Sequence, residues 1–446
     1  MITELRIVNR IDKVEFRSEI LTDEEKIMNK NYSALTLEEL PKRLSQISAI
    51  TDQIGTNFSE WNVTEVGDGN LNLVFIVIGS KGKIVIKQAL PYVRVVGDSW
   101  PLTLERAYFE YNALVRQENR DPGIVPSVFH FDREQGLIAM ECLDSHKILR
   151  GKLIAGEQVE NLGDVIGKHC ARLAFKGSDL FMDTKDKKHD VSLFQKNLEL
   201  MSITENLVFT DPYFEAKMNN NTKGLDPIIK IIRDDVTMKS RAQLMLFKFT
   251  SNTETMCHGD LHSGSIMCTE IDTKVIDPEF AFYGPMGFDL GMNIANYLMA
   301  FFSQPAHRQN STEINSYQNW ILKVIEETIQ AFIDEFSNLW HNNRQGILFP
   351  KCLFEDQDQS SQFALNSVIK NIWSDAVSIC GIEMHRRCLS LAHNADFEQI
   401  EDLSFRAKLE ARNLLMGREL ILNSDKIKDA SELTSLAIKF NERNIL

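Results

Sequence analysis

The spacing of apolar residues changes about a third of the way along the chain. Before residue 145, apolar and polar positions alternate over short runs, which is typical of strands. Such runs lie at 61–80, divided by a glycine turn, at 81–90 after a second turn near Gly79–Gly82, and at 124–143. Between them, residues 102–117 carry apolar side chains at helical spacing. The pattern predicts a small α+β unit.

Beyond residue 145 the apolar positions recur with helical spacing, at 156–177, at 226–249 and after residue 312. Two short apolar segments around turns lie between these helices, at 256–290. The sequence therefore predicts three parts, which are an N-terminal extension (1–30), a β-rich lobe (31–140) and a mainly helical lobe (141–446).

Length and composition fit this division. A chain of 446 residues is too long for one compact core, and 43% hydrophobic with 25% charged residues is ordinary globular composition. A net charge of −14 argues against nucleic acid as a partner, because phosphate backbones attract basic surfaces. The seven cysteines lack CxxC spacing, which indicates free thiols rather than a zinc or disulfide framework.

No membrane segment is expected. The apolar run NIANYLMAFF at 293–302 is shorter than the ~20 residues of a transmembrane helix and is typical of a buried helix. The first 20 residues carry charges throughout and have no apolar core of a signal peptide. A cytoplasmic protein is the expectation.

Two acidic motifs in the helical half carry the candidate chemistry. CHGDLHSGS at 257–265 places Asp260 on a loop, and VIDPEF at 275–280 follows with Asp277 and Glu279. Phosphoryl transfer needs a carboxylate that accepts or orients the acceptor hydroxyl, and further oxygens that hold Mg²⁺ against the phosphates. Each tripeptide alone is usually a turn. In this order and spacing, after a β-rich lobe with a strand lysine, they predict an ATP-dependent kinase with Asp277 and Glu279 as metal ligands.

The β-rich lobe offers groups for the nucleotide. The turn GDGNLN at 67–72 has backbone N–H groups that suit phosphate, although such a hairpin is more often structural. Lys87 lies on the following strand, where a lysine contacts ATP phosphates in protein kinases. Glu110 on the next helix is its expected ion-pair partner, and Glu105 is the weaker candidate. The strand end at 140–143 is a candidate hinge for adenine.

The motif HGDLH resembles the aminoglycoside phosphotransferase and choline kinase group, whose fold is protein-kinase-like. Three longer segments are similar to the methylthioribose kinases, namely GDGNLNLVF, KQALPYVRVVGDSWPLTLERA and HGDLHSGSIM with TKVIDPEFAFYGPMGFDLG. The resemblance covers most of 31–400. It implies a two-lobed protein-kinase-like fold, with a small β-rich N-lobe and a larger helical C-lobe. It also implies transfer of phosphate from ATP to the anomeric hydroxyl of 5-methylthioribose, a step of methionine salvage.

Two departures from the wider group favour the narrower resemblance. The wider group has Asn five residues after the HGD aspartate, as a metal ligand, where this chain has Ser265. The metal element reads DPE, as in methylthioribose kinases, so Glu279 is expected to supply the missing oxygen. The family hinge reads MEDL where this chain has Cys142, with little consequence because backbone groups hold adenine there.

The resemblance also implies site residues, ATP and Mg²⁺ as cofactors, and a homodimer. It implies substrate contacts at Asp260 and at an arginine of the segment EMHRRCLSLAHNADFE, which offers Arg386 and Arg387. These two point about 100° apart on a helix, so both need not face the site. The implied ATP contacts are Asn70, Lys87, Glu110, Glu141, Cys142, Leu143, Asp277, Pro278 and Glu279.

Several alternatives stay open at this point. A related kinase acting on choline, homoserine or an aminoglycoside fits the same motifs, and so does a nucleotide-binding pseudokinase. His258 and His262 are expected to be structural rather than zinc ligands, because their i, i+4 spacing falls in a loop. Asp289 is expected to bind the backbone of the HGD loop. Trp100 fits either the core or a lid.

Overall fold

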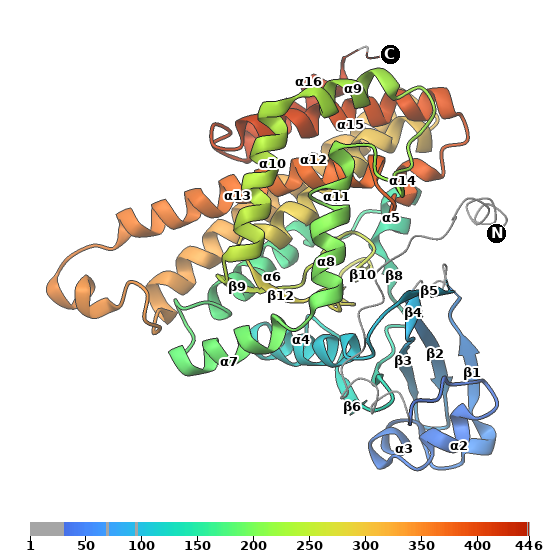
Figure 1. Ribbon diagram of the computed structural model, residues 1–446. Helices are drawn as coiled ribbons and strands as arrows, with labels where there is room; N and C mark the ends of the chain where they lie inside the picture. The colour runs from blue at the N-terminus through green and yellow to red at the C-terminus, as the bar shows by residue number, and fades with distance from the viewer. Residues whose placement is uncertain (1–30, 68–70, 94–96, 444, 446) are drawn as a thin grey trace. The chain divides into compact units, whose positions relative to one another are not determined.

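The structure, a computed structural model, describes residues 31–67, 71–93, 97–443 and 445 (Figure 1). The expected extension at 1–30 and the candidate ATP contact Asn70 lie outside the described residues. The chain divides into two compact units, and each is described by itself. The smaller comprises Met1–Val115 with Pro126–Leu143, and the larger comprises Arg116–Val125 with Asp144–Leu446.

The smaller unit is built on an antiparallel sheet with strand order β1-β2-β3-β7-β6 (Figure 1). A short hairpin, β4 with β5, follows β3 and was not predicted from the sequence. The strands are β1 (Asn62–Glu65), β2 (Asn72–Ile78), β3 (Lys83–Ala89), β4 (Tyr92–Val93), β5 (Gly97–Pro101), β6 (Val128–Asp132) and β7 (Leu137–Glu141). The helices are α2 (Leu40–Leu44), α3 (Ser48–Ile54), η3 (Phe58–Glu60) and the first part of α4 (Arg106–Arg120).

Alternation along β3 gives the sheet two different faces. Ile84 and Ile86 are fully buried in the core that also contains Phe75 and residues of α2 and α3. Lys87 points to the opposite face, since successive side chains of a strand alternate. It lies between Val74 of β2 and Ile138 of β7 in the ladder. The strand–helix–strand prediction is confirmed, and the central strand presents the lysine on the face away from this core.

The larger unit is mainly helical. Its longer helices are α6 (Leu162–Lys176), α7 (Thr184–Phe194), α8 (Leu198–Leu207), α9 (Asp226–Asp234), α10 (Val236–Ser251), α11 (Phe288–His307), α12 (Ser311–Asn343), α13 (Gln362–Leu389), α15 (Leu403–Asn423) and α16 (Ala430–Asn441). The short ones are α5 (Leu149–Ala155), α14 (Ala395–Glu398), η4 (Asp211–Tyr213), η5 (Lys351–Leu353) and η6 (Glu355–Gln357).

Helix α11 is the centre of this unit. Its residues from Phe288 to Gln304 are all buried, which confirms the buried helix predicted at 293–302. It packs against α13 at Gly287 and Gly291, where a Cβ atom would overlap backbone of the neighbouring helix. Across the described ranges, no helix is both long and apolar enough to cross a membrane, and the cysteines form no disulfide.

Two small sheets interrupt the helices and carry the motif loops. One has the order β11-β10-β8 and the other pairs β12 with β9, all antiparallel. Their strands are β8 (Lys147–Ile148), β9 (Thr255–Cys257), β10 (Ile266–Cys268), β11 (Thr273–Val275) and β12 (Phe282–Gly284). The HGD loop connects β9 to β10, and the DPE segment connects β11 to β12. The predicted pair of short apolar segments around turns is therefore confirmed, with the β10–β11 hairpin lying in chain order between the paired strands β9 and β12.

Candidate active site

The backbone of the HGD loop is held by hydrogen bonds to the side chain of Asp289. Asp289, at the start of α11, accepts from the backbone N–H groups of His258 (2.6 Å) and Gly259 (3.0 Å), which confirms its expected role. Burial raises the pKa of Asp289, although the two N–H groups oppose that rise. Gly259 has φ +89, and a side chain there would overlap the carbonyl of Phe280. The loop therefore requires glycine at this position.

The HGD loop and the DPE segment are also bound to each other. His258 Nε2 lies 2.9 Å from the carbonyl oxygen of Ile276, and its Nδ1 accepts from the N–H of Asp260 at 3.3 Å. The N–H of Ile276 donates to the carbonyl oxygen of Ser265. His258 is thus a bridge between the two segments.

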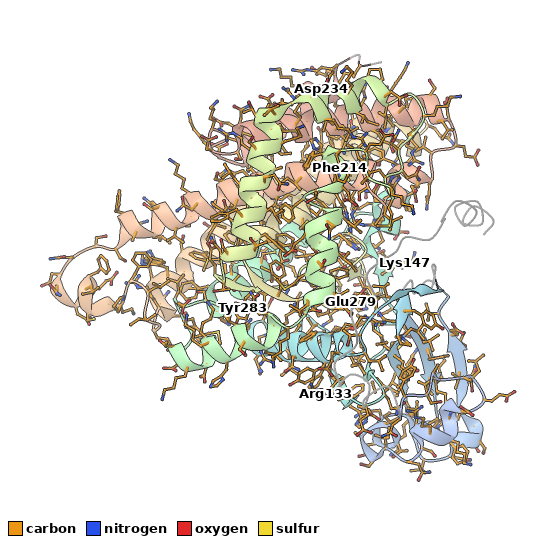
Figure 2. All side chains as sticks on the ribbon, viewed as in Figure 1. Arg133, Lys147, Phe214, Asp234, Glu279 and Tyr283 are labelled. Atoms are coloured by element: carbon orange, nitrogen blue, oxygen red, sulfur yellow. The ribbon has the colours of Figure 1, made fainter. Side chains whose placement is uncertain are left out.

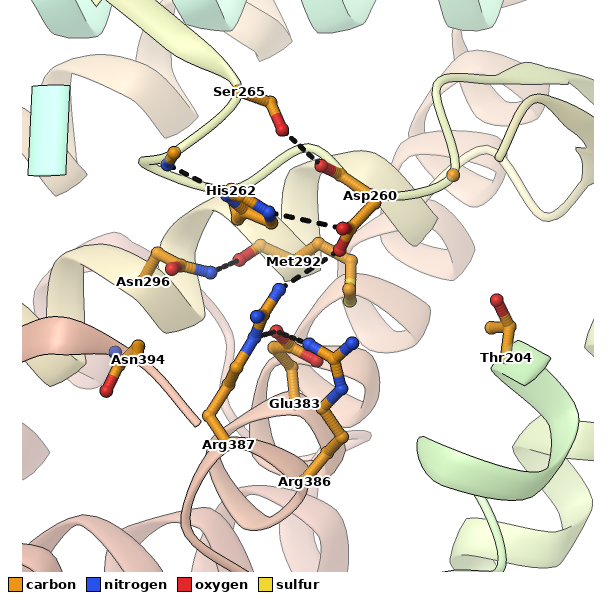
Figure 3. A network of polar contacts seen from close by, with 12 residues as sticks. Thr204, Asp260, His262, Ser265, Met292, Asn296, Glu383, Arg386, Arg387 and Asn394 are labelled. Atoms are coloured by element: carbon orange, nitrogen blue, oxygen red, sulfur yellow. Dashed lines mark hydrogen bonds and ion pairs between the residues drawn. The ribbon is translucent and has the colours of Figure 1, made fainter. Parts of the chain in front are cut away.

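Asp260 lies at the centre of a polar network in the larger unit (Figure 3). Its Oδ1 accepts from Arg387 Nη2 at 3.1 Å, and its Oδ2 is 3.2 Å from His262 Nε2. Burial alone would raise its pKa, but His262 and the charge of Arg387 outweigh burial and hold that pKa well below its usual value. About a fifth of the Asp260 side chain stays exposed. Asp260 is therefore an ionised, oriented carboxylate that solvent reaches.

Helix α13 brings two arginines to this network. Glu383 is fully buried, and its Oε1 accepts from Arg387 Nε at 2.5 Å and from Arg386 Nη1 at 3.3 Å. Figure 3 shows the Glu383 carboxylate between the two guanidinium groups, with Arg387 extending on toward Asp260. Arg387 contacts the candidate catalytic residue directly, whereas Arg386 donates its hydrogen bond to Glu383. The structure thus distinguishes the two arginines that the sequence left equivalent.

Ser265, which replaces the Asn of the wider group, is turned into the loop. Its hydroxyl donates to the carbonyl oxygen of Asp260 at 2.9 Å, and the residue is buried. Its hydroxyl therefore stabilises the conformation of the HGD loop through a hydrogen bond to the loop backbone.

The DPE segment adopts an unusual backbone conformation. Strand β11 ends at Val275, and Asp277 has φ +67, in the left-handed region that only Asn, Asp and Gly visit readily. Strand alternation therefore does not govern where Asp277 and Glu279 point. Even so, ligand oxygens of these two carboxylates lie within 4.8 Å of each other. Glu279, which is labelled in Figure 2, is buried. Two hard oxygen ligands at this separation fit a divalent cation such as Mg²⁺.

The smaller unit brings its own candidate pair together. Lys87 Nζ lies 2.8 Å from both carboxylate oxygens of Glu110, on the first part of α4, which confirms the expected ion pair. The weaker candidate, Glu105, instead pairs with Arg133 at 2.6 Å. Strand β7 ends at Glu141, and the chain passes from one unit to the other between Leu143 and Asp144. The predicted hinge residues therefore lie at the unit boundary.

Two groups of the network were not found from the sequence. Glu383 stands three and four residues before Arg386 and Arg387, and this helical salt-bridge spacing is a signal that identifies it. Arg150 lies on α5, and its Nη2 is 3.3 Å from Nδ1 of His262. No local pattern links Arg150 to a loop 112 residues downstream.

Comparison with known proteins identifies the family of this chain. The model described as "Phosphotransferase enzyme family" matches residues 62–320, and the chain belongs to this family. It is 41% identical over 409 residues to methylthioribose kinase of Escherichia coli O45:K1, covering 91% of this chain and 97% of the relative. It is 40% identical over 377 residues to methylthioribose kinase 1 of Oryza sativa subsp. japonica, covering 84% and 87%. Among the phosphotransferases, it belongs to the methylthioribose kinases.

A solved Plasmodium vivax ethanolamine kinase is similar over 90% of this chain and 94% of its own, with a TM-score of 0.45 and 12% identity. The kinase-like fold predicted from the sequence, with a small β-sheet unit and a mostly helical larger one, is confirmed by the family match.

Proposed function

We propose that this chain transfers the γ-phosphate of ATP to the anomeric hydroxyl of 5-methylthioribose. The observation that carries the proposal is the Asp260 carboxylate, held between His262 and Arg387 in a chain 41% identical to a methylthioribose kinase. The product would be 5-methylthioribose 1-phosphate.

In this mechanism Asp260 accepts a hydrogen bond from the sugar hydroxyl and aims its oxygen at the γ-phosphate. A carboxylate whose pKa lies well below normal is a weak base, so orientation matters more than early proton removal. This suits phosphoryl transfer, whose transition state is loose and requires little prior deprotonation of the nucleophile. The proton reaches Asp260 as the oxygen–phosphorus bond forms.

Charged groups are proposed to stabilise the phosphates. Lys87, oriented by Glu110, would contact the phosphates of ATP. Asp277 and Glu279 would hold Mg²⁺, which neutralises charge on the transferred group when bound. Arg387, which donates to Asp260, is the arginine that we propose to contact sugar or phosphate oxygens.

The division of the chain supports complementary roles for its two units. We assign the ATP phosphates to the smaller unit, and adenine to backbone groups at Glu141, Cys142 and Leu143, with Pro278 and Asn70 as further nucleotide contacts. We further propose a homodimer in the cytoplasm, which sedimentation of the purified chain and cell fractionation would test.

An acceptor panel with coupled detection of ADP tests the function. The purified chain is incubated with Mg·ATP and, separately, 5-methylthioribose, choline, homoserine or an aminoglycoside. We expect ADP formation to depend on 5-methylthioribose, with one phosphate transferred per ADP. Preference for another acceptor would replace the substrate, and Mg·ATP binding without turnover on any acceptor would indicate a pseudokinase.

A further inference from the structure

The two ring nitrogens of His262 face different kinds of partner. Nδ1 lies 2.8 Å from the backbone nitrogen of Gly264 and 3.3 Å from Nη2 of Arg150. A backbone N–H and a guanidinium only donate hydrogen bonds, so Nδ1 must be an acceptor. The ring proton of the neutral imidazole is therefore on Nε2, which lies 3.2 Å from Oδ2 of Asp260.

The surroundings keep this ring uncharged. Burial, together with the charges of Arg387 and Arg150, lowers the pKa of His262 to about 4 against the opposing effect of Asp260. Two further charged groups, Glu383 and Asp396, contact the arginines around His262 rather than the ring itself. Glu383 binds Arg387, and Asp396 of α14 lies 3.5 Å from Nε of Arg150. At neutral pH His262 is a neutral donor rather than a second base or a cation.

Arg150 is held in place from three directions. Its Nε donates to Ser263 Oγ at 3.1 Å, and its Nη2 donates to Asn296 Oδ1 of α11 at 3.2 Å. Its backbone N–H, at the start of α5, donates to the carbonyl oxygen of Ser263 at 3.0 Å. Arg150 is therefore fixed to the HGD loop itself, and its guanidinium cannot turn away from His262 without breaking these bonds.

We propose that His262 is a positioning residue for phosphoryl transfer, a neutral ring whose Nε2–H fixes the rotation of the Asp260 carboxylate, and that Arg150 and the Gly264 N–H together select this tautomer. Together, His262 on Oδ2 and Arg387 on Oδ1 hold both oxygens. Each oxygen keeps a second lone pair, which is available to an acceptor hydroxyl. The inference rests on the proposed role of Asp260 in the kinase reaction.

The tautomer is measured directly by ¹⁵N NMR of the full chain labelled at histidine, with the His262 signals assigned by their loss in His262→Gln. We expect an acceptor-type Nδ1 and a protonated Nε2 between pH 6 and pH 8, unchanged across this range. A proton on Nδ1, or a ring that becomes charged in this range, would overturn the proposal. This measurement needs no substrate, so it remains informative even if the proposed function fails in the acceptor panel.

Two substitutions separate positioning from packing. The amide nitrogen of Gln reaches close to the place of Nε2, so His262→Gln is expected to keep most of the turnover. His262→Leu removes the donor, and we expect kcat to fall about tenfold to a hundredfold with KM for ATP unchanged, as for loss of a hydrogen bond to a charged group. His146→Gln is the control, because His146 forms a comparable pair with Asp272 at 2.9 Å outside this network. Equal kcat for His262→Leu and the control would contradict the positioning role.

Arg150→Met tests whether the charge of Arg150 keeps the His262 ring neutral. Removing the positive charge raises the pKa of His262, so the ring would become charged at a higher pH. An imidazolium beside Asp260 weakens it as an acceptor, so the acid limb of the kcat profile is expected to move to higher pH. An acid limb at the same pH, together with an unchanged pKa of His262 by ¹⁵N NMR, would remove Arg150 from the proposal.

Discussion

The two units hold their central charged groups in different ways. In the smaller unit, Lys87 of β3 and Glu110 of α4 form an ion pair, with Lys87 Nζ 2.8 Å from the Glu110 carboxylate. In the larger unit, Asp260 contacts His262 of its own loop and Arg387 of α13, and Arg387 is further bound by Glu383. The lysine is oriented by its ion pair with Glu110, and the aspartate by a network that spans its own loop and a distant helix.

This difference follows from what each group is proposed to do. A lysine that contacts phosphates is a compact charge on a flexible stem and tolerates small shifts. A carboxylate that aims a hydroxyl at phosphorus must be held in direction as well as place, and small displacements at this step lower rates strongly. We therefore expect substitutions in the two units to separate into effects on nucleotide affinity and effects on turnover.

Asp260→Asn gives the largest expected effect. The amide keeps the size of the side chain but loses the acceptor charge, so kcat should fall about a thousandfold or more, with little change in ATP affinity. Steady-state kinetics and nucleotide titration measure the two quantities. Near-normal turnover would remove Asp260 from the catalytic role and end the contrast between the units.

Lys87→Met tests the other side of the comparison. Loss of a charged contact to phosphate should lower kcat/KM for ATP about a hundredfold. The effect should appear when ATP is varied and should be small when the acceptor is varied. Glu110→Gln, which leaves the lysine but weakens its orientation, should show the same pattern at smaller size. A purely acceptor-side effect would contradict the assignment of Lys87.

Arg387→Met and Arg386→Met sharpen the comparison within the network. Although burial raises the pKa of Asp260, the charge of Arg387 helps to hold it down. Removing Arg387 raises that pKa, so the carboxylate becomes protonated at a higher pH. The acid limb of the pH profile of kcat/KM therefore moves to higher pH. We expect about a thirtyfold loss at neutral pH for Arg387→Met, which removes a charge-assisted contact. Arg386→Met should shift the limb less, because its hydrogen bond goes to Glu383.

Ser265→Ala gives the smallest expected effect. It removes one hydrogen bond to the Asp260 carbonyl, and such a bond contributes about 1 kcal/mol to the free energy of unfolding. Thermal unfolding should show a small decrease in Tm, and the Mg²⁺ concentration for half-maximal turnover should not change. A strong shift in that Mg²⁺ dependence would instead identify Ser265 as part of the metal site.

Local patterns predicted the parts of the structure whose partners are close in sequence. The strand carrying Lys87 and the helix carrying Glu110 are separated only by the short β4–β5 hairpin, so alternation and helical spacing sufficed. The contact between Asp260 and Arg387 spans 127 residues, and only the resemblance to a known family pointed to the EMHRR segment. Which arginine reaches Asp260 depends on the rotation of α13, which no local pattern specifies.

Other features depended on backbone geometry. The left-handed conformation of Asp277 was not foreseen, because the sequence indicated only that DPE lies at the end of a short strand and not which backbone conformation follows it. Arg150 was missed since nothing near it in sequence resembles a motif. Residues 116–125, which are consecutive with the smaller unit in the chain, belong to the larger one through long-range packing.

The close fit of Gly259 against Phe280 has a consequence for how such enzymes diverge. With His258 bonded to Ile276 and Ile276 to Ser265, the HGD and DPE segments form one interlocked block. A substitution that moves either segment displaces the other, so natural variants are constrained to inherit both together. Changes in acceptor preference are then expected to accumulate outside this block, at positions that contact neither segment.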